Sequence, residues 1–400
     1  MPHLIVFSHL RWDFVFQRPQ HLLSRLARHY RVVYVEEPIR TAGPARLERS
    51  SPHPGVEVLR PHTPVDAEGF HDDQLALLQP LLSDHLERNR IDDYLVWFCT
   101  PMALPLLTEL APRTIVYDCM DDLAAMKDAP RQMRQRETAL LKSAHLVLTG
   151  GPSLYESRRT LHPNVMCLPS AVDADHYANA IATTRTEPMQ RAHRLQGSIG
   201  TPRLGFFGAI DERLDLALVA EIADADPRWQ IVMVGPVVKI DPDALPKRAN
   251  IHWLGPQPYD LLPQLVAGWN VCLMPFALNE TTRFISPTKT LEYMAAGKPI
   301  VSTAITDVRS MFSDVVRIAD DAGSFIDACR AALDERGHRL TERLAEMQAC
   351  VWRYSWTETV DVVRRAIEAV LSDESASWFH VESPSCIAGG VFPDRHDVEL

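Results

Sequence analysis

The chain has 400 residues, 46% of them hydrophobic and 23% charged, and its formal net charge is −11. This length suits two domains of ordinary size, each of which can bury its own core. The acidic balance argues against a dedicated nucleic-acid-binding protein, because such a protein shows a basic face. Seven cysteines at irregular spacings indicate reduced thiols in a cytosolic protein, and they show no zinc-binding spacing.

Short apolar runs alternate with helical stretches in both halves of the chain, which predicts an α/β protein with two doubly wound parallel sheets. The expected strands of the first half are Leu4–Phe7, Val32–Val35, Tyr94–Phe98, Thr114–Tyr117 and Leu146–Leu148. Those of the second half are Leu204–Phe207, Ile231–Val234, Ile251–Leu254, Val271–Met274, Ile300–Ser302 and Val316–Ile318. No apolar run reaches the roughly 20 residues that span a bilayer, and the N-terminus is expected to be a strand, not a signal peptide.

The boundary between the halves is expected in residues 173–201, which are rich in Ala, Thr, Arg and Gln and carry no strand pattern. We interpret this stretch as a linker with one helix, between an N-terminal domain of residues 1–172 and a C-terminal domain of residues 202–354. An amphipathic helix is expected over Glu358–Leu371. Residues 373–400 show little hydrophobic periodicity and are predicted to form a tail.

The loop after the first strand concentrates charged and aromatic side chains. In an open α/β sheet, ligands bind beyond the carboxyl ends of the strands, so this loop points into the expected crevice. Arg11 or Arg18 could hold an anionic group there, and Trp12 could stack on a sugar. Asp13 could accept hydrogen bonds from sugar hydroxyls, and His9 is a further candidate catalytic group. The alternative is a salt-bridged loop anchored by buried aromatic residues.

Three carboxylates follow the fourth predicted strand, at Asp118, Asp121 and Asp122. Carboxylates at this edge of the sheet could bind an acceptor hydroxyl or stabilise positive charge at a sugar carbon. We therefore predict Asp118 and Asp121 as catalytic candidates. The competing interpretation is that Asp121 or Asp122 caps a helix.

A short helix is predicted between a loop and the buried strand at Ile300. Ser286 would cap it, Pro287 would take the first helical position, and Gly297 would end it. A helix start offers free backbone N–H groups and the positive end of the helix dipole.

The side chains at this helix start predict a phosphate site. Ser286 and Thr288 add hydroxyls, and Lys289 adds a cation. Glu292 lies about one turn further along, where its carboxylate could accept hydrogen bonds from ribose hydroxyls. The alternative is a capped surface helix with one exposed acid.

Two stretches of the chain resemble retaining glycosyltransferases of the GT-B fold. Residues 279–303 are similar to the nucleotide-binding segment of these enzymes. Residues 8–21, which read Ser-His-x-x-Trp-Asp-x-x-x-Gln-Arg-Pro-Gln-His, are similar to a bacterial subgroup that makes teichuronic-acid and galactofuranose-linked polysaccharides. Over residues 1–372 the chain is identified as a member of family 4, the "glycosyl transferases group 1" type. This implies that the helix at about 355–372 crosses back to an acceptor-binding N-terminal domain.

The resemblance also implies a diphosphate site at the start of the second half. Members of the family often carry a Gly-Arg pair there, with a lysine five residues after the glycine. Gly208 aligns with that glycine, Ala209 replaces the arginine, and Arg213 stands at the position of the lysine. Guanidinium suits a diphosphate because it binds phosphate bidentately. The alternative is a surface arginine paired with Asp211 or Asp215.

The remaining donor-site residues are implied in the same way. Gly235 and Gln257 follow strands whose relatives pack around the nucleobase. In many members a second glutamate precedes the one matching Glu292 by eight residues, but this position is Phe284. Glu280 is the candidate substitute. The departure affects recognition of the donor sugar more than binding of the nucleotide.

The function implied is metal-independent transfer of a sugar from a nucleotide diphosphate sugar, with UDP expected, to a hydroxyl acceptor with retention of anomeric configuration. The resemblance implies no cofactor beyond this co-substrate and no nucleic-acid partner. The acceptor is expected to be a small molecule, a lipid-linked sugar or a polysaccharide. A cytoplasmic protein is expected, and a peripheral contact with the inner face of the membrane would suit lipid-linked acceptors.

Three alternatives stay open. A GT-B nucleotide-sugar epimerase would need acid and base groups on the sugar and no acceptor site. A non-catalytic nucleotide-sugar-binding protein would suit the family residues missing at positions 209 and 284. A metal-using glycosyltransferase would need an Asp-x-Asp motif, which occurs at Asp173/Asp175 and Asp224/Asp226 but follows no apolar strand.

Overall fold

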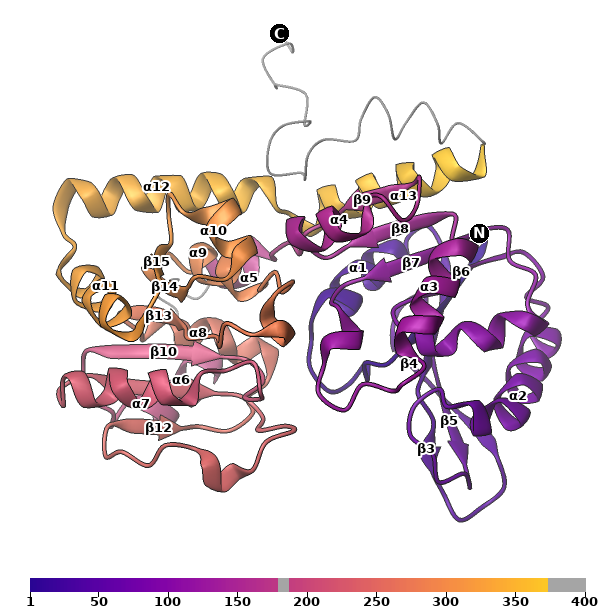
Figure 1. The fold of residues 1–400 in the computed structure, drawn as a ribbon, viewed down its shortest axis with the longest axis horizontal. Coiled ribbons are helices and arrows are strands. Elements are labelled where there is room, and N and C mark those ends of the chain that lie inside the picture. The colour runs from indigo at the N-terminus through magenta and orange to yellow at the C-terminus, as the bar shows by residue number, and fades with distance from the viewer. Residues whose placement is uncertain (179–186, 373–400) are drawn as a thin grey trace, which may run out of the picture. The chain divides into compact units, whose positions relative to one another are not determined.

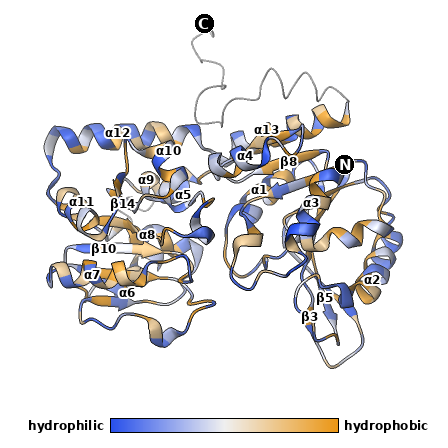
Figure 2. Cartoon of the chain, viewed as in Figure 1, coloured by the Kyte–Doolittle hydropathy of each residue, from blue (hydrophilic) through white to orange (hydrophobic). Residues whose placement is uncertain are grey.

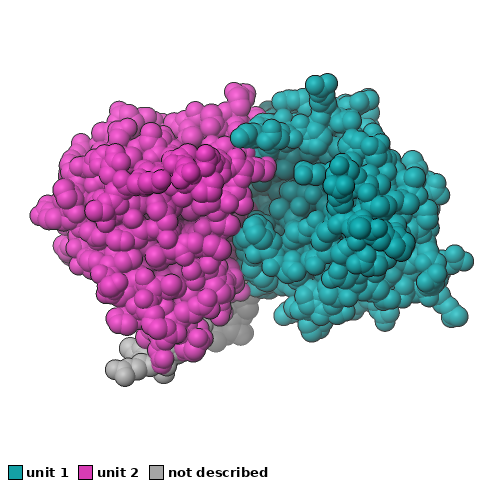
Figure 3. Space-filling model, turned by 90° about the horizontal axis from the view of Figure 1, so that it is seen from below, with its two compact units in different colours: residues 1–169, 356–400 teal, residues 170–355 magenta. Residues whose placement is uncertain are grey.

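The computed structural model describes residues 1–178 and 187–372, which form two compact units. Unit 1 joins Met1–Pro169 to the chain from Trp356 onward, and unit 2 is Ser170–Ser355 (Figure 3). The chain therefore leaves unit 1 once and returns to it through the last helix. The predicted tail, residues 373–400, lies outside the described residues.

Unit 1 is built on a nine-stranded sheet with the order β3-β5-β2-β1-β6-β7-β8-β9, to which β4 adds by pairing with β5 (Figure 1). All pairs are parallel except β4 with β5. The strands are β1 (His3–Ser8), β2 (Arg31–Glu36), β3 (Ile39–Arg40), β4 (Arg46–His53), β5 (Val56–Thr63), β6 (Tyr94–Phe98), β7 (Ile115–Cys119), β8 (Leu146–Thr149) and β9 (Val165–Cys167).

Four of these strands were not expected from the sequence: β3, β4, β5 and β9. Strand β4 is almost entirely exposed, so it carries no apolar run that could have revealed it. Strand β5 alternates buried and less buried positions and contains Pro61, which is uncommon in a strand interior. Strands β3 and β9 have only two and three residues. The other five strands, each with a continuous apolar run, were predicted.

The helices of unit 1 include the one that returns from unit 2. They are α1 (Arg18–Leu26), α2 (Leu75–Arg88), α3 (Met133–Ser143), α4 (Pro152–Arg158) and α13 (Trp356–Leu371), with 3-10 turns η1 (Asp72–Gln74), η2 (Pro101–Glu109) and η3 (Leu123–Ala125). Helix α13 packs against α1 and buries Trp356, Val360, Val363 and Ile367. This spacing places the four side chains on one face, so α13 is amphipathic (Figure 2).

Unit 2 is built on a six-stranded parallel sheet with the order β12-β11-β10-β13-β14-β15. If these strands are numbered from one along the chain, their order in the sheet is 3-2-1-4-5-6, which is that of the doubly wound dinucleotide-binding fold. The strands are β10 (Arg203–Phe207), β11 (Gln230–Val234), β12 (Ile251–Trp253), β13 (Val271–Met274), β14 (Ile300–Thr303) and β15 (Arg317–Ala319). All six were expected from the sequence.

The helices of unit 2 are α5 (Ala174–Ala178), α6 (Glu187–Gln196), α7 (Leu216–Ala225), α8 (Leu262–Ala267), α9 (Lys289–Ala295), α10 (Thr306–Phe312), α11 (Ala322–Asp334) and α12 (Gly337–Arg353), with 3-10 turns η5 (Pro242–Ala244), η6 (Tyr259–Leu261) and η7 (Glu280–Thr282). The expected linker of residues 173–201 thus contains two helices of unit 2. Helix α5 packs on α9 and α6 packs on α8, because Tyr177, Ala192 and Gln196 are buried there.

The strand orders fix where a ligand would bind in each unit. The order reverses between β1 and β6 in unit 1, and between β10 and β13 in unit 2. Ligands of such sheets bind at the carboxyl ends of the strands on either side of the reversal. The loops after β1 and β10 begin at these points, and they hold six of the predicted site residues: His9, Arg11, Trp12, Asp13, Gly208 and Arg213. Within the described part of the chain, we find no helix with the length and apolar character needed to cross a membrane.

Candidate functional site

Two glycine loops of unit 2 lie against each other at the carboxyl ends of β10 and β11. Gly208 and Gly235, which follow β10 and β11, have φ angles of +140° and +148°. The Gly208 N–H donates to the Val234 carbonyl at 2.9 Å, and the Gly235 N–H donates to the Gly255 carbonyl at 2.9 Å. A Cβ atom on Gly235 would lie 1.8 Å from the Gly208 carbonyl oxygen. Glycine is therefore required at position 235 for the two loops to approach each other.

Lys289 reaches this pair of loops from α9. Its Nζ atom lies 5.4 Å from the ring centroid of Phe206 and 5.2 Å from that of Phe276. A Cβ atom on Gly208 would lie 3.2 Å from this Nζ. The structure thus brings together a cation and a backbone turn with no side chain, which is an arrangement suited to an anionic group.

Helix α9 begins two residues later than predicted, at Lys289. Thr288 is its N-terminal flanking residue and has α-helical angles, with no side-chain hydrogen bond to cap the helix. The expected cap at Ser286 is therefore wrong. The reason is a turn in which the Pro287 carbonyl accepts from the Thr290 N–H before the regular helix starts. Ser286 and Thr288 are half-buried in this turn.

Glu292 is buried on α9, one turn beyond Thr288. The Tyr177 hydroxyl donates a hydrogen bond to its Oε1 atom at 3.0 Å. Burial raises the pKa of Glu292 to about 7, although the charge of Lys289 and the hydrogen bond from Tyr177 act in the opposite direction. The expected alternative of an exposed acid on a surface helix therefore does not describe Glu292.

Arg213 forms an ion pair within its own loop. Its Nε atom lies 3.1 Å from both carboxylate oxygens of Asp211, and its Nη2 lies 2.6 Å from Oδ2. Asp215 instead caps α7 by accepting from the Leu218 N–H. The pairing with Asp211, which was the alternative for Arg213, is thus present.

Gln257 and Glu280 also have local contacts. The Gln257 side-chain amide donates to the Leu254 carbonyl at 2.9 Å. Its buried Oε1 has no hydrogen-bond partner among the residues described. Glu280 is exposed and lies 3.6 Å from Arg283, and no other ion pair is recorded for it in the described chain. Nothing in these contacts connects Glu280 to the glycine loops.

The loop after β1 in unit 1 is organised around Glu36, a residue not singled out from the sequence. Glu36 is fully buried at the end of β2. Its Oε1 accepts from the Trp12 N–H at 2.8 Å, and its Oε2 accepts from Arg60 at 2.6 Å and from Arg11 at 3.2 Å. Arg60 also pairs with Asp13 at 3.0 Å. The contacts of Arg11, Trp12 and Asp13 are therefore those of the salt-bridged alternative.

Arg18 and Asp118 form a buried ion pair. The Arg18 Nη2 and Nε atoms lie 2.9 and 3.3 Å from the two oxygens of Asp118, and Nη1 donates to the Leu168 carbonyl at 2.7 Å. Both residues are at most 5% exposed. This pair joins the start of α1 to the ends of β7 and β9. The two predicted site residues therefore bind each other.

The other predicted residues of unit 1 lie in short loops. His9 is half-buried directly after β1. The Asp121 carbonyl accepts from the Leu123 N–H at 3.0 Å. Asp122 flanks the turn η3 without a side-chain capping bond and lies 3.6 Å from Arg158. Helix capping by Asp122 is therefore not observed.

Both aspartates of the Asp224/Asp226 motif form ion pairs with arginines. Asp224 pairs with Arg248 at 2.7 Å, and Asp226 pairs with Arg228 at 2.6 Å. Within residues 1–178 and 187–372 there is no group of three or more His, Cys, Asp or Glu side chains that could hold a metal ion.

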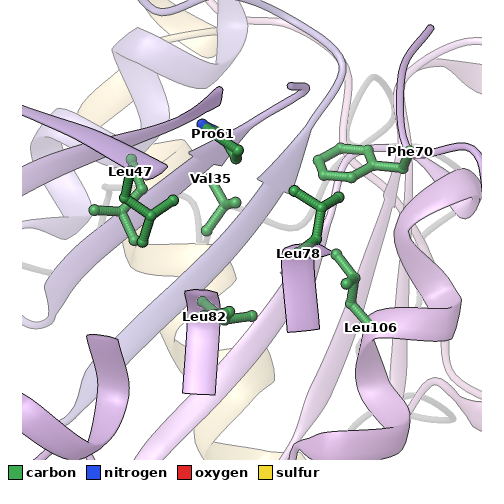
Figure 4. Close-up of a pocket in the computed structure, with 8 residues that line it drawn as sticks. Val35, Leu47, Pro61, Phe70, Leu78, Leu82 and Leu106 are labelled. Atoms are coloured by element: carbon green, nitrogen blue, oxygen red, sulfur yellow. The ribbon is translucent and has the colours of Figure 1, made fainter. Parts of the chain in front are cut away.

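Unit 1 contains a cavity that none of the predicted site residues lines (Figure 4). It lies between β4, β5 and α2, and its lining is entirely apolar: Val35, Leu47, Leu59, Pro61, Phe70, Leu78, Leu82 and Leu106. Such a lining offers no donor or charge to a polar ligand. We therefore regard it as an imperfectly filled part of the core.

Comparison with known proteins finds a family model that matches part of the chain and a curated relative. Residues 201–335 match the model of the family "Glycosyl transferases group 1". The chain is 27% identical over 263 residues to TuaH of Bacillus subtilis (strain 168), a glycosyltransferase assigned to teichuronic acid biosynthesis. This match covers 60% of the chain and 64% of TuaH.

Solved structures share the fold at low sequence identity. Sucrose-phosphate synthase from Thermosynechococcus elongatus has a TM-score of 0.68 and 13% identity, with 93% of this chain and 100% of that chain covered. Anabaena Alr3699/HepE in complex with UDP and glucose has a TM-score of 0.68 and 13% identity, with 92% and 100% covered. These structures are GT-B glycosyltransferases, and the predicted GT-B fold is confirmed.

Proposed function

We propose that this chain, whose residues 201–335 belong to the glycosyl transferases group 1 family, transfers a sugar from a nucleotide diphosphate sugar to a hydroxyl acceptor. We further propose UDP as the nucleotide, retention of the anomeric configuration and no requirement for a metal ion. The observation that carries the proposal is the placement of Lys289 against the Gly208 loop, with Glu292 one turn further along the same helix.

Lys289 would act on the leaving group. When the bond between the sugar and the diphosphate breaks, negative charge builds on the departing phosphate oxygens. A fixed ammonium group and nearby backbone N–H groups stabilise such charge more in the transition state than in the ground state. The aromatic rings of Phe206 and Phe276 flank the ammonium group and hold its approach to the loop. Arg213 is held by Asp211, so we assign it a supporting role in shaping this loop.

Glu292 would bind the ribose. A carboxylate accepts hydrogen bonds from two neighbouring hydroxyls, and a ligand that donates such bonds favours the ionised form. The pKa of about 7 means that the free protein holds this group close to its titration point at neutral pH. Nucleotide binding is therefore expected to weaken as the pH falls below 7.

For the acceptor, we propose the loops after β1 and β7 of unit 1. The ion pairs of Arg11, Asp13, Arg18 and Asp118 would give these loops a fixed shape. His9 and Asp121 then stay as the catalytic candidates among the predicted residues. A small molecule, a lipid-linked sugar or a polysaccharide each fits this proposal, and so does a peripheral membrane contact.

The test compares two lysine variants of unit 2. Thermal unfolding is measured with UDP and UDP-glucose, with and without EDTA, for wild type, Lys289→Ala and Lys247→Ala. Lys247 is exposed and pairs only with Asp243 among the residues described, at 3.3 Å, so it serves as the matched control. A ligand at ~100 times its dissociation constant adds about 2.7 kcal/mol to stability.

We expect an EDTA-insensitive shift in wild type and Lys247→Ala that is lost in Lys289→Ala. Transfer to an added acceptor should fall at least about 100-fold in Lys289→Ala, as for other fixed donors to a developing anion. A stabilising shift that Lys289→Ala retains in full would contradict the proposed site. Binding without turnover in the presence of any acceptor would favour the non-catalytic alternative.

A further inference from the structure

Tyr177 contacts the proposed ribose-binding carboxylate from a segment that the sequence did not connect to the site. It lies on α5, 115 residues before Glu292, and its side chain is completely buried. Its hydroxyl donates to Glu292 Oε1 at 3.0 Å. No hydrogen bond to Oε2 of Glu292 is recorded within the described part of the chain, so this second oxygen is the one available to a ligand hydroxyl.

The Tyr177 ring is fixed by an aromatic cluster. It lies nearly parallel to Phe207, with ring centroids 6.4 Å apart, and edge-on to Tyr259 at 6.5 Å. His176 stacks flat on Tyr259 at 4.1 Å and places its Nε2 3.1 Å from the Tyr259 carbonyl oxygen. These ring contacts hold the Tyr177 hydroxyl in position.

The charged and titratable groups near Glu292 are few. Lys289 lies on the same helix, and Tyr177 faces the carboxyl from α5. The buried phenol of Tyr293 is also close enough for Glu292 to raise its pKa. Helix α12 and strand β14 also pack on α9, but among the described residues no charged side chain from either acts on the Glu292 carboxyl. Tyr177 is thus the one neutral donor to the Glu292 carboxyl that the structure records in its described residues.

We infer that Tyr177 is a positioning residue of the nucleotide-sugar site, whose hydroxyl orients the Glu292 carboxylate so that Oε2 accepts the ribose hydroxyls. This inference rests on the proposed function, because it assigns a ligand to Glu292. A hydrogen bond from a neutral phenol stabilises the ionised carboxylate, so Tyr177 would both aim the group and keep it charged. Tyr177 itself would not touch the reacting atoms.

The test is the pH dependence of UDP-glucose binding to the full chain carrying Tyr177→Phe. UDP-glucose is a suitable probe because each of its phosphates carries one ester and one anhydride bond, so neither has a proton to titrate near neutral pH. Calorimetric titration between pH 6 and 9 gives the dissociation constant and the pH below which binding weakens. We expect binding about tenfold weaker at pH 7, from loss of a bond to a charged group. The midpoint should also move to higher pH, because the variant carboxyl loses a bond that favours its ionised form.

Two further variants separate positioning from folding. Tyr293→Phe removes another buried hydroxyl of the same cluster, one that accepts from the Phe207 N–H at 3.1 Å. It should lower the melting temperature while the pH midpoint stays at its wild-type value. Glu292→Gln should remove the midpoint, and Tyr177→Phe added to Glu292→Gln should then weaken binding no further.

The outcomes distinguish this inference from the proposed function. If wild type binds UDP-glucose and Tyr177→Phe binds it equally with the same midpoint, the inference is wrong and the proposed function stands. A midpoint that shifts equally in Tyr293→Phe would also overturn the inference, since it would reflect a general loosening of the cluster. If wild type binds none of UDP-glucose, GDP-mannose and dTDP-glucose, both proposals fail.

Discussion

The loops that follow the first strand of each unit occupy equivalent places in the two sheets but are built differently. In unit 1 the loop after β1 is rich in charged side chains, and Glu36 and Arg60 bind them within the unit. In unit 2 the loop after β10 turns on Gly208, beside Gly235 and the Lys289 ammonium group. The comparison teaches that many charged residues at a switch point can serve the fold, whereas an open backbone next to a cation indicates a ligand.

The largest expected effect comes from breaking the ion pair of unit 1. Arg18→Ala would leave Asp118 buried without its partner, which typically costs about 3–5 kcal/mol. The matched control is Arg113→Ala, which removes an exposed pair with Asp93 and should cost less than about 1 kcal/mol. Urea unfolding of the two variants measures the difference. If Arg18 serves the acceptor instead, the variant would keep its stability and show a raised KM for the acceptor.

A second prediction concerns the glycine loops of unit 2. Gly235→Ala would force a Cβ atom against the Gly208 carbonyl oxygen, so the two loops must separate. We expect a loss of about 3 kcal/mol and of UDP binding. Gly255→Ala is the control, because its φ of +66° is also positive but no atom lies within 4 Å of the added Cβ; it should cost about 1 kcal/mol. Equal UDP binding by both variants would show that the close approach of these loops is not part of the site.

The third prediction uses the raised pKa of Glu292. Its folded pKa of about 7 lies above the ordinary value of 4.5, so its stabilising contribution is complete below about pH 4.5 and is lost as the pH rises through 7. Glu292→Gln removes this loss of stability, because a glutamine side chain does not ionise as the pH rises. The free variant should therefore be more stable than wild type above pH 7, by at most about 3 kcal/mol, with little difference near pH 4.5.

The same variant should bind nucleotide more weakly, so its effects on stability and on binding have opposite signs. Thermal unfolding at pH 5 and pH 8, with and without UDP, measures both. A variant that is less stable than wild type at pH 8 without ligand would show that the Glu292 carboxylate supports the fold rather than the ligand.

The strands of both sheets were largely predictable, because a strand buried on both faces must carry a continuous apolar run. Tyr94–Phe98 is such a run, and its bounds agree with β6. Strand β4 was not predicted, because its residues are almost all exposed and show no alternation of apolar and polar side chains. The start of α9 was misplaced because Ser286-Pro287 favours a helix cap, while the backbone forms a turn there first.

Contacts within the candidate site were predictable only between residues that are close in the sequence. Lys289 and Glu292 could be placed together because they share one helix. Glu36 and Tyr177 were missed because their importance comes from partners far along the chain, at Trp12 and Glu292. No local sequence pattern distinguishes a buried carboxylate that binds several groups of a loop, such as Glu36, or a tyrosine that donates to a distant carboxylate, such as Tyr177. Such residues can be identified only when the three-dimensional structure is known.

The most direct test of the account is the hydrogen-exchange footprint of UDP-glucose on the full chain. We predict that the ligand slows exchange in the loops at Gly208 and Gly235 and at the start of α9, and that Lys289→Ala removes this protection. The loop of residues 8–17 should exchange at the same rate with and without the donor alone. Protection confined to unit 1, or protection of unit 2 that survives Lys289→Ala, would contradict the assignment of the donor site to these loops.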